Sequence, residues 1–205
     1  MSDFMLPLVE ALDSGNADDE MYRECLNNRI LLINTDIDDD IIDSYELYIF
    51  KWNAEDRHIP VEDRQKIRIF INSVGGDTFS ATNLADVILN SKTPVVGIGL
   101  SLVASASFHI YLACHERVAF YNTVFLQHDG SITISNSSSK AKQTMAFFDT
   151  MEKRNKEYVL SRTNMDSDFY DSIFDEEYYF YPDHGKELGV VHKIIGEDIE
   201  LIDIL

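Results

Sequence analysis

Apolar residues occur along this chain in two patterns, short unbroken runs and longer stretches with helical spacing. The two patterns alternate along the sequence. The unbroken runs begin near residues 29, 67 and 94, and each has the length of a buried strand. Helical spacing follows the first two runs, over residues 36–56 and 80–91. Because strands that alternate with helices favour a parallel sheet, the pattern predicts an α/β fold.

The second half of the chain continues this order with shorter elements and one long helix. Residues 140–163 repeat apolar residues at helical spacing among many charges, so we expect this helix to project partly into solvent. Residues 131–139 begin as an alternating strand and end as a polar, serine-rich segment. Pro182 suits the first position of a helix and Gly189 its end. The other predicted elements are a short helix at 104–116 and strands at 117–120, 123–127 and 190–195.

The amino-terminal segment differs in composition from the rest of the chain. Residues 1–20 combine a short apolar patch with the run SGNADDE, which is typical of a turn, so we expect a flexible arm there. Neither an internal repeat nor an interdomain linker interrupts residues 21–205. We therefore predict a single domain after the arm, with a projecting segment over residues 129–163.

Charge and composition narrow the function classes. The 205 residues carry 17 basic and 36 acidic side chains, a net charge of −19, which repels nucleic acids and anionic membranes. No apolar run reaches about 18 residues, and no basic segment precedes an apolar one at the amino terminus, so we expect a cytoplasmic protein. Cys25 and Cys114 form no CxxC motif, and no histidine has a partner at a ligand spacing. We therefore predict neither a disulfide framework nor a metal site.

Three candidate features lie just after predicted strands, where a parallel sheet places its ligands. Gly75 and Gly76 bend the backbone tightly and expose N–H groups, either as an oxyanion hole or only as a strand-to-helix turn. Ser105 begins the short helix and is either a nucleophile or an N-cap. His128 follows an apolar strand and is either a general base or an exposed loop residue.

Two neighbouring hydroxyl groups compete with Ser105 for the role of nucleophile. Ser101 lies four residues before it and Ser107 two residues after it, and nothing in the local pattern excludes either. A serine at the start of a helix lies in a positive field that favours a nearby oxyanion, and small neighbours leave room for a substrate.

Taken together, these segments resemble the proteolytic subunit of the Clp protease (ClpP). Residues 71–76, INSVGG, are similar to the INSPGG turn of that family. Ser105 lies 29 residues after Gly76, the offset of the family's nucleophile in its AASMGAF segment. Residues 121–128, YNTVFLQH, are similar to PNSRVMIH, which ends in the family's general base. The resemblance extends over residues 22–196.

The resemblance implies a serine endopeptidase of the ClpP/crotonase fold, built from repeated β-β-α units. Ser105 would attack the peptide carbonyl, and His128 would take and return the proton. The N–H groups of Gly76 and Ala106 would hold the oxyanion, and no cofactor is implied. The family further implies homo-oligomers of stacked seven-membered rings, an ATP-driven Clp-type unfoldase that delivers unfolded protein chains, an amino-terminal arm lining the axial pore, and helix 140–163 as the handle where two rings meet.

Alternatives remain open for the acid that orients His128. Family spacing, 12 residues before Gly189, selects Glu177; Asp175 could reach His128 if the strand is shifted in register, or the acidic run is only a solvated turn. A second hypothesis is a catalytically weak or inactive ClpP homologue that serves as partner subunit or scaffold, because Glu176 and Glu177 stand where the family has Arg and Asp, and Ser101 replaces a family glycine. A third is a crotonase-type acyl-CoA enzyme, whose phosphate-rich ligand the net charge disfavours.

Overall fold

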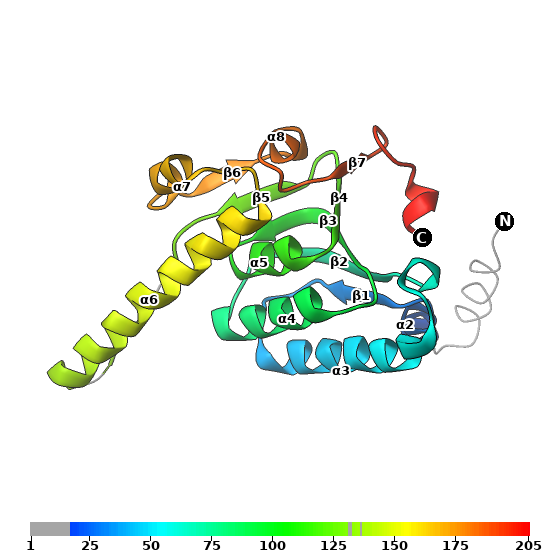
Figure 1. Cartoon of the computed structure of the whole chain (residues 1–205), viewed down its shortest axis with the longest axis horizontal. Helices are drawn as coiled ribbons and strands as arrows, with labels where there is room; N and C mark the ends of the chain where they lie inside the picture. Colours follow the sequence, from blue (N-terminus) through cyan, green and yellow to red (C-terminus); the bar gives the residue numbers. More distant parts are fainter. Residues whose placement is uncertain (1–16, 131–132, 136) are drawn as a thin grey trace.

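A seven-stranded sheet runs through the middle of the molecule, whose computed structural model describes residues 17–130, 133–135 and 137–205 (Figure 1). Its main path follows the order β1-β2-β3-β4-β7, and all neighbours on this path are parallel. Beside it, β5 pairs in parallel with β3, and β6 pairs antiparallel with β5. The strands are β1 (Ile30–Ile33), β2 (Ile67–Ser73), β3 (Val95–Ala104), β4 (Glu116–Phe120), β5 (Val124–Gln127), β6 (Tyr178–Phe180) and β7 (Lys193–Ile195). The predicted α/β fold is confirmed.

Helices α3, α4 and α5 cover one face of the sheet (Figure 1). The core lies between these layers, where Ile67, Ile69 and Ile71 of β2 and Leu84 of α4 are fully buried. The opposite face carries a smaller cluster, joined by Ile204 from the carboxyl-terminal 3-10 turn. The helices are α2 (Ala17–Asn27), α3 (Asp39–Glu55), α4 (Thr78–Asn90), α5 (Ala106–Ala113), α6 (Ser138–Arg162), α7 (Ser167–Ile173) and α8 (Pro182–Glu187), with 3-10 turns at Asp56–His58, Val61–Asp63 and Leu201–Ile204.

Helix α6 leaves the body of the molecule and extends away from it, as the sequence predicts (Figure 1). It has 25 residues, and only Val159, near its carboxyl-terminal end, is buried. That end is attached to α5 by side chains: Tyr158 Oη donates to the His109 carbonyl at 2.9 Å, and Arg162 Nε donates to the Leu112 carbonyl at 2.9 Å. The remaining turns make few contacts with the body, so we call α6 the handle helix.

The structure differs from the predicted elements in three places. Residues 17–20, the end of the expected arm, form the first turn of α2, while residues 1–16 lie outside the described residues. Of the strand predicted to begin at residue 131, residues 131–132 lie outside the described residues, and residues 133–135 form no strand. Between the handle and Pro182, the chain forms α7 and β6, which the apolar pattern leaves unmarked. No helix among the described residues is both long enough and apolar enough to cross a membrane.

Candidate active site

The Gly75-Gly76 turn after β2 packs directly against the start of α5. Both glycines have positive φ angles, 100° and 150°. A Cβ atom on Gly75 would lie 2.7 Å from Ser105 Cβ and 2.9 Å from the Ala106 nitrogen, and one on Gly76 would overlap the Ile37 backbone. Only glycine fits both positions, because a side chain at Gly75 would collide with the start of α5 and one at Gly76 with Ile37.

Ser105 lies at the sharp junction between β3 and α5. Its φ of 54° and ψ of −124° are unusual for a residue with a side chain and cost about 1–3 kcal/mol, a strain that is common at functional sites. The Ser105 N–H donates to the Leu126 carbonyl of β5 at 3.1 Å, which holds the junction in place. Ser105 occupies the N-cap position of α5, but its side chain forms no capping hydrogen bond.

The two rival serines lie in different environments. Ser107 is fully buried, and its hydroxyl is used by the backbone: it accepts from the Ala104 N–H at 2.9 Å and lies 2.8 Å from the Ala104 carbonyl and 3.0 Å from the Ser73 carbonyl. Ser101 is exposed on β3 and does not line the cavity that Ser105 shares with His128. The geometry therefore favours Ser105.

Two backbone N–H groups beside Ser105 are available to a ligand. The Ala106 N–H belongs to the first turn of α5 and has no acceptor among the described residues. The Gly75 carbonyl and the Asp77 N–H both bond to Ile37, so the Gly76 N–H between them points to the opposite side. These two N–H groups are the pair that the sequence predicts as an oxyanion hole.

His128 follows β5 and is held by an acid that lies just before the neighbouring strand, β6. Its Nδ1 lies 2.9 Å from Oε1 of Glu177. The antiparallel register of β5 and β6 accounts for this contact, because Gln127 pairs with Tyr178 and the next residues on each strand then face each other. Asp175 is exposed in the turn before β6, and the register brings Glu177 to His128 instead.

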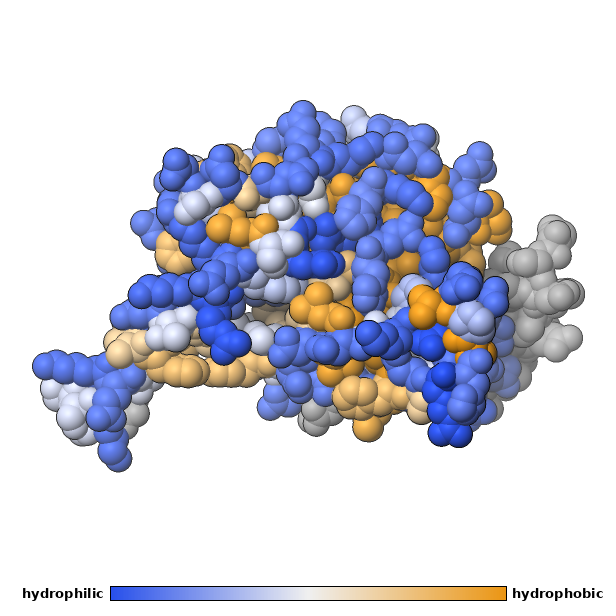
Figure 2. Space-filling model, in the orientation of Figure 1, coloured by the Kyte–Doolittle hydropathy of each residue, from blue (hydrophilic) through white to orange (hydrophobic). Residues whose placement is uncertain are grey.

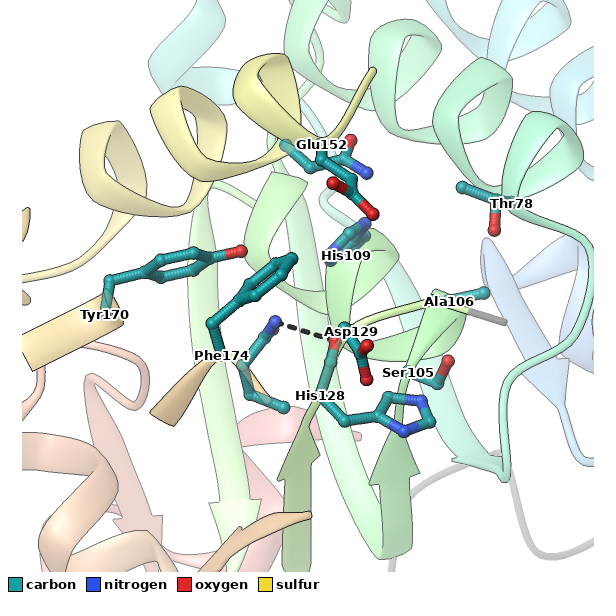
Figure 3. A pocket seen from close by; sticks show the side chains of 12 residues that line it. Thr78, Ser105, Ala106, His109, His128, Asp129, Glu152, Tyr170 and Phe174 are labelled. Atoms are coloured by element: carbon teal, nitrogen blue, oxygen red, sulfur yellow. Dashed lines mark hydrogen bonds between the residues drawn. The ribbon is translucent and has the colours of Figure 1, made fainter. Parts of the chain in front are cut away.

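The His128 ring lies beside the Ser105 side chain in the same cavity (Figure 3). Its Nε2 is buried and has no hydrogen-bond partner, and no hydrogen bond joins it to the Ser105 hydroxyl in the described part of the chain. A buried ring nitrogen without a partner is poised to accept a proton. Contacts of this kind often tighten only when a substrate is bound.

Known proteins resemble this chain in sequence and in fold. The sequence model of the Clp protease family, described as Clp protease, matches residues 13–198. The chain belongs to the Clp protease family. It is 23% identical over 190 residues to the ATP-dependent Clp protease proteolytic subunit 2 of Corynebacterium diphtheriae, covering 92% of each chain. It is 29% identical over 139 residues to subunit 3 of Rhizobium johnstonii, covering 67% of this chain and 72% of that one.

A solved Clp protease structure confirms the fold class. A mutant of ClpP1 from Listeria monocytogenes superposes with a TM-score of 0.73 at 20% sequence identity, covering 90% of this chain and 99% of that chain. The resemblance inferred from the turn, serine and histidine segments is therefore confirmed at the level of family and fold.

Sequence reasoning missed the outer part of this Clp protease cavity. His109, Glu152 and Asn155 line it together with residues of α7. Burial and the nearby His128 lower the pKa of His109 to about 4, so its ring is neutral at pH 7. The spacing offered a signal, because His109 lies four residues after Ser105 on α5 and therefore on the same face. No group of three potential ligands for a metal ion occurs within the described ranges.

Proposed function

We propose that this chain is a serine endopeptidase, the proteolytic subunit of a Clp-type protease that cleaves unfolded chains delivered by an ATP-driven unfoldase. One observation carries the proposal. His128 bonds through Nδ1 to Glu177 at 2.9 Å, while its buried, unpartnered Nε2 belongs to the cavity that contains Ser105. A base that an acid orients beside a strained serine is the arrangement that acyl transfer requires.

The proposed reaction is acyl transfer in two steps. Ser105 Oγ attacks the peptide carbonyl carbon as its proton passes to His128 Nε2, and the N–H groups of Gly76 and Ala106 hold the resulting oxyanion. The carbon–nitrogen bond then breaks as His128 returns the proton to the leaving amine. Water, deprotonated by His128, releases the acyl group from Ser105. The proposed reaction uses no metal and no cofactor.

Glu177 is proposed to orient the His128 ring and to stabilise its charged form during the reaction. The Glu177 carboxylate is solvent-exposed, with 60% of its side chain accessible, and its second oxygen accepts a hydrogen bond from Tyr179 Oη at 3.3 Å. Solvent screening weakens the attraction between such a carboxylate and an imidazolium. We therefore expect activity below that of a site with a buried aspartate.

The proposed assembly is a homo-oligomer of stacked seven-membered rings, with the handle helices between rings. Apolar residues form a band along α6 (Figure 2), where Met145 and Phe147 are 45% and 56% exposed. Helix α2 also exposes Met21 and Tyr22. A second copy that covers these residues would remove apolar surface from water. Sedimentation at micromolar concentration tests this, and a monomeric mass contradicts it.

The acyl-CoA alternative lacks support in the cavity. No Lys or Arg lines it, whereas a ligand with several phosphates requires cations. All 17 Lys and Arg residues belong to the described part of the chain. The acyl-CoA hypothesis also assigns no role to the hydrogen bond between His128 and Glu177.

A fluorophosphonate label tests the proposal on the assembled protein. An active peptidase should be modified at one serine, which mass mapping should identify as Ser105, and Ser105→Ala should abolish the label. A label that persists in Ser105→Ala would overturn the assignment of the nucleophile. If no serine is modified, the chain acts as an inactive partner subunit or scaffold.

A further inference from the structure

The cavity beside the proposed nucleophile and base has a polar outer wall that the reaction itself does not use (Figure 3). Thr78 comes from α4, His109 from α5, and Glu152 and Asn155 from the handle helix. These residues surround the space next to the nucleophile, where a substrate side chain would lie. Their chemistry therefore bears on which side chain the site accepts.

The charge of this wall is negative. Asp129 and Glu152 contribute two carboxylates to the cavity, and no Lys or Arg lines it. His109 adds no positive charge at neutral pH, because burial and the nearby His128 lower its pKa to about 4. Residues outside the described ranges include no Lys or Arg, so they cannot neutralise these carboxylates.

Glu152 shares the adjoining groove with two lysines, Lys153 and Lys156, and with the carboxylates of Asp149 and Asp171. Lys156 lies one turn further along the handle helix, the usual position for an ion pair, but its Nζ is bonded to both carboxylate oxygens of Asp171, at 2.6 and 2.7 Å. The same Nζ lies 5.9 Å from the centre of the Tyr170 ring. Glu152 forms no ion pair with any described residue, which leaves its carboxylate available to a substrate.

The space beside Glu152 suits a long, slender side chain. The inner cavity measures only about 40 Å³, but it adjoins an open groove of about 480 Å³. Glu152, Tyr170 and Phe174 line both spaces and so form the passage between them. Aromatic rings favour contact with an aliphatic stem and with a cation above their faces.

We propose that this cavity binds the substrate side chain on the acyl side of the cleaved bond, and that Glu152 makes it select lysine or arginine there. The inference rests on the proposed function, because the cavity is a substrate pocket only if Ser105 is the nucleophile. The basic side chain lies along Phe174 and Tyr170 with its charge at Glu152. The net charge of −19 further concentrates basic peptides around the protein.

Two peptidyl diphenyl phosphonates test this selectivity on the assembled protein. They are identical except for a lysine or a leucine side chain at the reacting position, and an alkyl fluorophosphonate without a peptide accompanies them. The lysine probe should modify Ser105 faster than the leucine probe, by up to about fivefold, the upper end for a solvent-exposed ion pair. High salt should reduce this ratio.

Variants on the handle helix distinguish a local effect of the Glu152 carboxylate from the effect of the protein's overall negative charge. Glu152→Gln should bring the ratio of the two rates close to one, and Glu152→Lys should bring it below one. Glu157→Gln removes the same charge from an exposed position of the same helix, outside both spaces, and should leave the ratio unchanged.

The outcomes distinguish this inference from the function on which it rests. A leucine probe that reacts as fast as the lysine probe, or a ratio that Glu152→Gln does not change, overturns the selectivity while the fluorophosphonate still labels Ser105. If the fluorophosphonate fails to label Ser105 as well, the proposed function itself is wrong and the pocket inference falls with it.

Discussion

The sheet and the handle helix differ in how much of their apolar surface a single chain covers. Ile67, Ile69 and Ile71 in β2 are completely buried, whereas Met145 and Phe147 in α6 remain about half exposed. Buried side chains stabilise the fold of the isolated chain, but exposed ones contribute only when another surface covers them. The sheet and its helices therefore sustain the fold, while the sequence of the handle is free to serve other purposes.

The candidate site lies where these two regions meet. The proposed nucleophile and base, Ser105 and His128, follow strands of the sheet, whose positions are held by hydrogen bonds and packing. Glu152 comes from the handle. Rigid elements therefore position the proposed reacting side chains, and a more exposed helix forms the outer wall of the cavity beside them. Four predictions test this division, in order of decreasing effect.

Removing the hydroxyl of Ser105 should greatly lower the rate of hydrolysis and hardly change the stability of the fold. Ser105→Ala should lower the rate of peptide hydrolysis by at least about 10³-fold, because the covalent intermediate can no longer form. The free energy of unfolding should change by no more than about 1 kcal/mol, because the side chain forms no capping hydrogen bond. A fluorogenic peptide assay and urea denaturation measure the two quantities. Ser101→Ala is the control, and hydrolysis that survives in Ser105→Ala would identify a different nucleophile.

A pair of truncations compares the two regions directly. Ile69→Ala should destabilise the chain by about 2–5 kcal/mol, because it leaves a cavity at a fully buried position. Phe147→Ala should change the free energy of unfolding of a single chain by about 0.5 kcal/mol or less, because the ring lies on the exposed handle. Urea denaturation under dissociating conditions measures both. Equal losses would mean that the handle folds back onto the body.

His109 should make the stability of the body depend on pH. Its pKa in the folded chain is lowered to about 4 from an ordinary value of 6.5, first by burial and then by the nearby His128. Between these values the unfolded chain binds more protons, so stability should fall as the pH drops from 6.5 to 4, by up to about 3 kcal/mol. Urea denaturation at pH 7 and pH 5 measures the change.

Substitution isolates the contribution of His109. His109→Leu should flatten the curve of stability against pH in this range, whereas His58→Leu, at an exposed position, should not. Burial also lowers the pKa values of His115 and His192, so a weaker dependence of the same sign should remain. An unchanged curve in His109→Leu would show that the ring titrates normally in the folded chain.

The acid beside His128 should have the smallest of the four effects. Glu177→Gln should lower kcat by about 10- to 100-fold with little change in KM, because a group that only orients the base acts on the chemical step. Asp175→Asn should leave both constants unchanged. If Asp175→Asn alone impairs the reaction, the register of β6 in solution differs from this structure; if neither does, Ser105 and His128 act as a pair.

The choice between these two acids marks the limit of what the sequence predicts. The apolar pattern alone predicts α3, β2, α4 and β3, because the spacing within each segment is a local property that burial against a single core preserves. The projecting handle followed in the same way from its mixture of charged and apolar residues. The offsets between segments also identified Ser105 and His128 as candidates.

Which side chains meet in the site depends on how distant segments pack in the folded chain. Glu177 lies 49 residues from His128 along the chain, and its contact depends on the register of the three-residue strand β6 against β5. A shift of one residue would turn the carboxylate to the other face of the sheet, and no local pattern specifies so short a strand. Ser107 likewise looked equivalent to Ser105 until backbone packing occupied its hydroxyl. Contacts between distant segments set these outcomes, because register and burial are properties of the packed chain and of no single segment.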